Sequence, residues 1–228
     1  RWSSGFADCP QGDMYMIPSN KAAWHAIGER LGLIMVWVNR SFSTGEVKLA
    51  SADPAAPLDI DFNMCSDARD MERLVIGTRM MCKLQADAAV QDTVEQVFPI
   101  TYSDWARRLT VHSTFNAAQT RLGAAVMDAS AGIRRFLIEK LIADAPSLDD
   151  LAHDDGACRD WIRGAVLGHW HASCTCRMGR DDDPGAVTDA SARVHGIEGV
   201  RVADASIMPA VPCANTNIPT IMIGEKVA

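Results

Sequence analysis

Two short segments with alternating apolar and polar residues restrict the fold of this chain more than any other feature. Residues 46–50 (Glu-Val-Lys-Leu-Ala) and 58–62 (Leu-Asp-Ile-Asp-Phe) carry an apolar side chain at every second position. This alternation is typical of antiparallel strands that have one covered face. An apolar run at 33–39 precedes them, and Ser43-Thr44-Gly45 predicts a tight turn that joins it to 46–50. The sequence therefore predicts an antiparallel sheet.

Segments with helical periodicity follow the predicted strands. One helix is expected over 66–84, where a Ser-Asp pair can cap the first turn, and another over 155–167. A longer helix is expected over 114–145, ended by Asp144-Ala145-Pro146. Strands followed by helices, without regular alternation of the two, indicate an α+β fold.

Composition and charge exclude nucleic-acid-binding and membrane-spanning proteins. The net charge is -7 and no basic run occurs, whereas a phosphate-binding surface needs clustered Lys and Arg. No apolar stretch approaches the roughly 20 residues that cross a bilayer. Seven widely spread cysteines favour reduced thiols and a cytoplasmic location. Arg1 is not an initiator Met, which predicts that the chain is a fragment of a longer polypeptide.

Two imidazoles and two thiols lie within eight residues, at His169, His171, Cys174 and Cys176. In an extended segment, residues two apart point to the same side, so both imidazoles could face one site. An imidazole is suited to take a proton from an alcohol. The same four side chains could instead bind zinc, although structural zinc sites usually space their cysteines more widely. A third interpretation is one buried and one solvent-facing histidine; we expect no metal.

The C-terminal residues predict a short strand over 199–206 and a helix that begins near Asn217 and Pro219. The first N–H groups of a helix lack intrahelical partners, and the helix dipole makes this end favourable for an anion. Phosphate or a reduced flavin would suit it. The alternative is that Asn217 or a neighbour caps an ordinary helix.

Three ordered blocks, residues 171–179, 193–209 and 214–226, resemble the C-terminal signature of the glucose-methanol-choline (GMC) oxidoreductases. Segments 37–39 and 61–70 resemble the substrate domain of the same family, so the resemblance covers most of the chain. It implies FAD-dependent oxidation of a primary alcohol to an aldehyde. The residues in these blocks are most similar to those of members that act on aryl or furfuryl alcohols and to those of choline-dehydrogenase-like members.

The resemblance also implies two domains. Residues 1–167 would form the substrate-binding domain. Residues 168–228 would hold the catalytic histidine segment and return a strand and a helix to a Rossmann-like FAD domain. No Gly-x-Gly-x-x-Gly sequence follows a strand here, although that element cradles the FAD pyrophosphate. The expected partner is therefore an N-terminal FAD-binding half, on the same precursor or on a companion chain.

The catalytic and substrate residues follow from the same resemblance. His171 matches the catalytic histidine, the expected base for the substrate hydroxyl, and Asn215 matches the second residue beside flavin N5. His169, Trp170 and Trp37 are expected to line the substrate pocket, where the two indoles would supply flat walls.

The cofactor residues are also assigned by the resemblance. Asp204 and Ala205 match the contacts to the FAD phosphate and ribityl chain, and Thr216 and Asn217 match contacts to the flavin pyrimidine. Two departures from the family are Cys174, where many members have Gly, and His169, which is not general. The alternatives are a hydroxynitrile lyase on the same scaffold and a His/Cys metal-binding module.

Overall fold

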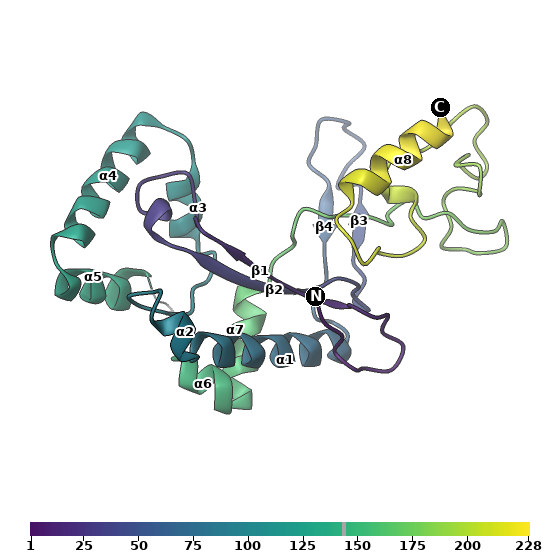
Figure 1. Cartoon of the computed structure of the whole chain (residues 1–228). Coiled ribbons are helices and arrows are strands. Elements are labelled where there is room, and N and C mark those ends of the chain that lie inside the picture. Colours follow the sequence, from purple (N-terminus) through teal and green to yellow (C-terminus); the bar gives the residue numbers. More distant parts are fainter. Residues whose placement is uncertain (143–144) are drawn as a thin grey trace. The chain divides into compact units, whose positions relative to one another are not determined.

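The computed structural model describes residues 1–142 and 145–228, and the chain divides into two compact units (Figure 1). Unit 1 consists of Arg1–Met14, Val38–Asp70 and Leu167–Ala228. Unit 2 consists of Tyr15–Trp37 and Met71–Val166. The mixture of helices with small sheets confirms the α+β class.

Unit 1 contains a hairpin of two short antiparallel strands, β3 (Glu46–Lys48) and β4 (Asp59–Asp61), with Val47 directly opposite Ile60 (Figure 1). The predicted turn at 43–45 does not join β3 to the apolar run before it, because β3 pairs only with β4 among the strands of the described residues. The reason lies in the anchoring of this segment. The Asp70 carboxylate accepts hydrogen bonds from the backbone N–H of Phe42 and from the N–H and hydroxyl of Ser43.

The hairpin has one charged and one apolar side. We call the second the apolar hairpin face; its residues alternate along the two strands and are 42–81% exposed, namely Val47, Leu49, Leu58, Ile60 and Phe62. The expectation that one strand face would be covered is therefore wrong for this chain. A two-stranded hairpin cannot cover its own face, and a third strand or a helix would be needed.

The C-terminal part of unit 1 is rich in loops and ends with the 3-10 helix η3 (Ala205–Ile207) and the helix α8 (Asn217–Val227), which contact each other. The predicted strand over 199–206 is reduced to a single bridge between Arg193 and Arg201. A strand requires a neighbour to pair with along its length, and here the N–H of Val202 donates to the carbonyl of Ala192 without a continuous ladder on either side among the described residues.

Unit 2 contains most of a two-stranded sheet and nearly all of the remaining helices. The strands are β1 (Met14–Ser19) and β2 (Leu33–Val38), of which only β2 is predicted by the sequence. The helical elements are η1 (Gly28–Arg30), α1 (Ala68–Gln85), α2 (Ala88–Gln91), α3 (Asp104–Thr110), α4 (Thr114–Ala129), α5 (Ala131–Leu137), the π-helical η2 (Ile138–Ile142), α6 (Leu148–His153) and α7 (Asp155–Ala165). Two ion pairs, Arg79–Asp155 and Arg159–Glu72, join helices α1 and α7.

The predicted helices at 66–84 and 155–167 are confirmed as α1 and α7. The single helix predicted over 114–145 is wrong, because α4 and α5 are separated at Ser130. This residue is extended, and its hydroxyl accepts a hydrogen bond from the N–H of Ile133 as an N-cap. The predicted end at Asp144 lies outside the described residues.

The structure also describes the state of the thiols and the hydropathy of the helices. All seven cysteines are free thiols, and Cys82 and Cys158 are buried. Within the described ranges, no helix combines the length and the hydropathy that a membrane span requires.

Candidate active site

The candidate active site lies within unit 1, where backbone hydrogen bonds hold the histidine segment against the segment of η3. The N–H groups of Cys174, Cys176 and Met178 donate to the carbonyl groups of residues 205, 206 and 207, at 3.2, 2.9 and 2.9 Å. The segment that carries His171 is therefore fixed along η3. Because η3 also contacts α8, the histidine segment and the start of α8 share one region of the unit.

The His171 ring is held at both nitrogens by two consecutive residues that precede α8. Its Nδ1 lies 3.0 Å from Thr216 Oγ1, and its Nε2 lies 2.9 Å from Asn215 Nδ2. His171 is half-buried and Asn215 is exposed, whereas Thr216 is only 8% exposed. The structure thus brings together His171 and Asn215, the two residues expected to be catalytic.

His169 lies beside this pair. Its ring is half-buried and edge-on to the His171 ring, with the ring centroids 5.7 Å apart. Burial lowers the pKa of His169, and the nearby His171 charge lowers it further. The two imidazoles are neighbours as expected, although the backbone between them is not extended.

Trp170 interrupts the extended backbone, because it has φ +55°, in the left-handed region. A bulky residue rarely adopts this conformation, and such strain is concentrated at functional sites. Its indole is 82% exposed and lies 5.4 Å from the His169 ring. Cys174 is also left-handed, with φ +74°, which explains in physical terms why glycine suits this position.

Trp37 occupies unit 2, near the end of β2. Its ring packs edge-on against Tyr15, with centroids 4.6 Å apart. The indole thus has a packing partner within its own unit, and its place in a substrate pocket stays a prediction.

The start of α8 has an unusual cap. Thr216 is the N-cap residue, but its side chain makes no capping hydrogen bond and is instead directed to His171. Asn217 is the first helical residue rather than the cap, and it is exposed. The side chain that would ordinarily satisfy an N–H group of the first turn is therefore used elsewhere, and this helix end keeps its preference for an anion.

Asp204 and Ala205 lie at η3, next to α8. The Asp204 carboxylate accepts a hydrogen bond from the N–H of Ser206 at 2.8 Å and so caps η3. The Ala205 carbonyl is used by Cys174. Both residues therefore shape the loop under the histidine segment.

The metal-binding alternative lacks a ligand set. In the part of the chain that the structure describes, no group of three or more His, Cys, Asp or Glu side chains is arranged to bind an ion. His169, His171, Cys174 and Cys176 accordingly do not form such a group.

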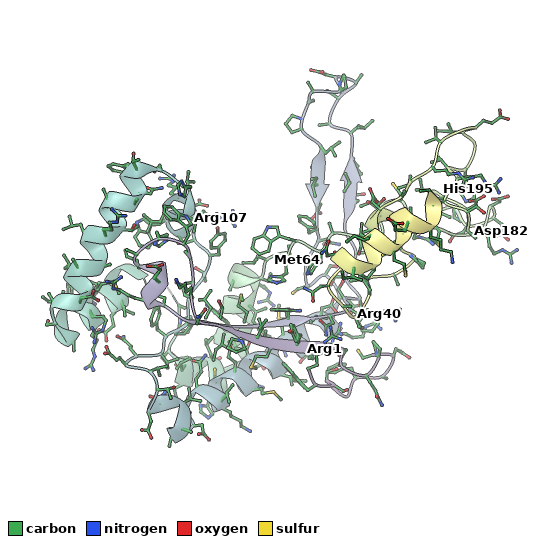
Figure 2. The ribbon with its side chains drawn as sticks, turned by 45° about the horizontal axis from the view of Figure 1, so that its top comes forward. Arg1, Arg40, Met64, Arg107, Asp182 and His195 are labelled. Atoms are coloured by element: carbon green, nitrogen blue, oxygen red, sulfur yellow. The ribbon has the colours of Figure 1, made fainter. Side chains whose placement is uncertain are left out.

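Another titratable cluster lies in the loop between residues 179 and 199, in which Figure 2 labels Asp182 and His195. His195 Nδ1 lies 2.9 Å from Asp181. Arg177 and Asp183 form a bidentate pair at 2.7 and 2.8 Å, which closes the acidic turn. These contacts order the loop, and none involves the His171 ring.

The Thr216–His171 contact is not predicted by the sequence. The two residues are 45 positions apart, and no spacing rule links a threonine to a histidine at that separation. The only sequence feature that points to Thr216 is its position before a helix, where threonine is a common N-cap. That feature predicts a partner for its hydroxyl but does not identify His171.

Comparisons with known proteins show which sequences and structures this chain resembles. A family model described as GMC oxidoreductase matches residues 41–224. The chain is 38% identical over 198 residues to 5-(hydroxymethyl)furfural oxidase of Methylovorus sp. (strain MP688), which covers 87% of the chain and 30% of that protein. It is 46% identical over 74 residues to oxygen-dependent choline dehydrogenase of Vibrio vulnificus (strain YJ016), covering 32% of the chain and 13% of that protein.

A solved structure shares the fold. A fungal aryl-alcohol oxidase superposes with a TM-score of 0.55 at 22% identity, over 86% of this chain and 24% of that chain. The chain thus spans less than a third of the length of these three proteins.

Proposed function

Because this chain belongs to the GMC oxidoreductase family, we propose that it forms the substrate-facing wall of an FAD-dependent enzyme that oxidises a primary alcohol to an aldehyde. Members of the family are FAD-dependent. The observation that carries the proposal is the His171 ring, with Asn215 at its Nε2, beside the start of α8.

The residues present fit one edge of a flavin. The start of α8 has no side-chain cap, and the positive end of a helix dipole stabilises negative charge near it. Thr216 and Asn217 lie at that end, and Asp204 and Ala205 would face the ribityl and phosphate region from η3. We assign residues 168–228 to the catalytic and returning FAD part and residues 1–167 to the substrate domain.

His171 would act as the base through Nε2. An alcohol hydroxyl at this nitrogen would donate its proton to it as the C–H bond breaks. The Asn215 amide, which donates to Nε2 in this structure, would release that nitrogen to the alcohol and donate to the substrate oxygen instead, where it would stabilise the negative charge that develops. The alcohol would thereby lose its hydroxyl proton to His171 and a hydride from its carbon, and would become an aldehyde. When bound, FAD supplies the acceptor for that hydride at N5.

We further propose an aromatic or heteroaromatic alcohol as the substrate. Over matches of comparable length, the chain is 38% identical to the furfural oxidase (198 residues), and 28% and 31% identical to two oxygen-dependent choline dehydrogenases (195 and 189 residues). The exposed indole of Trp170, next to His169, offers a flat surface for such a ring.

The remaining wall would come from an FAD-binding half on the same precursor or on a companion chain. Two observations support this partner: the sequence lacks a dinucleotide-binding glycine motif, and the apolar hairpin face is uncovered. We expect the 228-residue polypeptide, purified alone, to contain much less than one flavin per chain. Stoichiometric flavin absorbance would contradict the proposal.

The function is tested in the complete flavoenzyme by anaerobic mixing with an aryl or furfuryl alcohol. We expect the flavin band to bleach, and the His171→Ala variant to bleach about 10²–10⁴-fold more slowly with its flavin still bound. His153→Ala is a matched control, because that histidine is exposed on α6. Near-normal bleaching in His171→Ala would remove this residue as the base. Substrate turnover without any bleaching would instead indicate the lyase.

A further inference from the structure

We propose that Thr216 is a positioning residue that holds the His171 ring with its proton on Nδ1, so that Nε2 is the basic nitrogen. The role of that nitrogen rests on the proposed function, whereas the position of the proton depends only on contacts within unit 1.

The proton is located by the donors around the ring. The amide nitrogen of Asn215 carries hydrogens and no free lone pair, so at 2.9 Å it donates and Nε2 accepts. A neutral imidazole has one N–H, which must then be on Nδ1. Thr216 Oγ1, 3.0 Å from Nδ1, is the acceptor for that N–H.

The Thr216 hydroxyl is committed to this role by burial. Only 8% of the residue is exposed, and a buried hydroxyl needs a hydrogen-bond partner. A threonine at an N-cap ordinarily accepts a hydrogen bond from an N–H of the first turn, but Thr216 makes no such bond. The hydroxyl therefore contacts His171 in place of the helix.

The position of Thr216 is itself fixed by α8. Its carbonyl accepts hydrogen bonds from the N–H and the hydroxyl of Thr220, at 2.9 and 2.6 Å. A β-branched side chain also has few rotamers. The helix thus holds the hydroxyl in place against the ring.

The alternative tautomer, with the proton on Nε2, would be unsuited to both neighbours of the ring. With the proton on Nε2, the ring would present a donor to the donor of Asn215, and Nε2 could not accept a proton from an alcohol. Loss of one hydrogen bond that selects a tautomer changes the equilibrium constant between the two tautomers by up to about 10-fold, which is the upper limit for the loss of the reactive form. We expect the rate of proton abstraction to fall by up to the same factor.

The test compares Thr216→Val, which removes the hydroxyl at nearly constant shape, with Thr216→Ser, which keeps it. In the complete flavoenzyme with ¹⁵N-labelled histidine, the ring shifts of His171 report which nitrogen carries the proton. We expect an Nδ1–H signal in the wild type and in Thr216→Ser, and its loss or averaging in Thr216→Val. Flavin reduction should be up to about 10-fold slower in Thr216→Val than in Thr216→Ser when the two variants contain equal amounts of flavin.

Two results would overturn the inference. One is an unchanged Nδ1–H signal with a wild-type reduction rate in Thr216→Val. The other is equal damage in Thr216→Ser and Thr216→Val, because that would indicate packing rather than hydrogen bonding. Failure of the proposed function is distinguishable: no alcohol would then reduce the wild-type flavin, whatever the tautomer signals of the variants.

Discussion

The Asn215→Asp variant provides a direct electrostatic test of the candidate site. It replaces an amide by a carboxylate of nearly the same shape, 2.9 Å from His171 Nε2. A negative charge at this distance stabilises the protonated imidazole. Because the proposed base must be unprotonated to accept a proton, the active form becomes less populated at neutral pH. Activity should therefore be lost at higher pH than in the wild type as the pH falls.

The size of the shift follows from Coulomb's law. At the Nε2–Nδ2 distance of 2.9 Å, two unit charges interact by about 1.4 kcal/mol in bulk water and about 6 kcal/mol at an effective dielectric constant of 20. Asn215 is exposed, so the value near that of water applies best. Since about 1.4 kcal/mol corresponds to one pH unit, we expect the acidic limb of the rate profile to move upward by about one to two units.

The assay is the rate of anaerobic flavin reduction from pH 5 to pH 10, measured at low salt. Asn215→Ala is the matched control, because it removes the amide donor without adding charge. That control should lower the rate at every pH, by about 10²-fold if the amide stabilises the developing alkoxide, and should move the limb upward by less than Asn215→Asp does, because it removes only a hydrogen bond to the neutral ring. An acidic limb at the wild-type pH in Asn215→Asp would refute the assignment of His171 and Asn215 as a coupled pair.

Two further predictions concern stability. In Asp70→Asn, one acceptor of the hydrogen bonds from Phe42 and Ser43 becomes a donor, so the free energy of unfolding in urea should fall by about 1.5–3 kcal/mol, and an unchanged midpoint would contradict the anchoring role. Burial lowers the pKa of His25, whose Nδ1 accepts the N–H of Gly28, so its contribution to stability is present above the ordinary histidine range and is lost as the pH falls below about 6. In His25→Asn, the free energy of unfolding should differ less between pH 7.5 and pH 5 than it does in the wild type. An equal difference in the two proteins would exclude His25 as a cause of the lower stability in acid.

Helix positions could be predicted because their signals are local. Asp154 accepts the N–H of Ala157 at the start of α7, and Ser113 accepts that of Asn116 at the start of α4. The same chemistry ended the long predicted helix, since Ser130 caps α5 and cannot remain in the helix before it. A serine inside a periodic run can be a cap or a tolerated residue, and only the tertiary structure decides between them.

Strand pairing could not be predicted in the same way. Strand β1 contains Pro18 and has no regular alternation of buried and exposed residues, so the sequence does not indicate it. In the described residues, β2 pairs with β1 and β3 pairs with β4, so the turn at 43–45 does not join two paired strands. Pairing between segments distant in sequence depends on contacts that local patterns do not contain.

The site was predictable only through the resemblance. Spacing alone left three interpretations of His169 and His171, and it contained no reason to bring Asn215 to His171. The contacts between them depend on the packing of η3 against α8 and on the hydrogen bonds from 174–178 to 205–207. Such contacts depend on tertiary packing, which is why the role proposed for Thr216 rests on the structure and not on the sequence.

The hairpin illustrates what alternation encodes. It correctly separates the two sides of β3 and β4, because Val47 faces Ile60 across the ladder while Glu46 and Lys48 lie on the other side with Asp59 and Asp61. It does not encode which atoms cover the apolar side. Charges confined to one side indicate that this side faces water, so the apolar hairpin face is suited to contact protein. The proposed FAD-binding half would meet this requirement, in the same unit that contains His171, Asn215 and the start of α8.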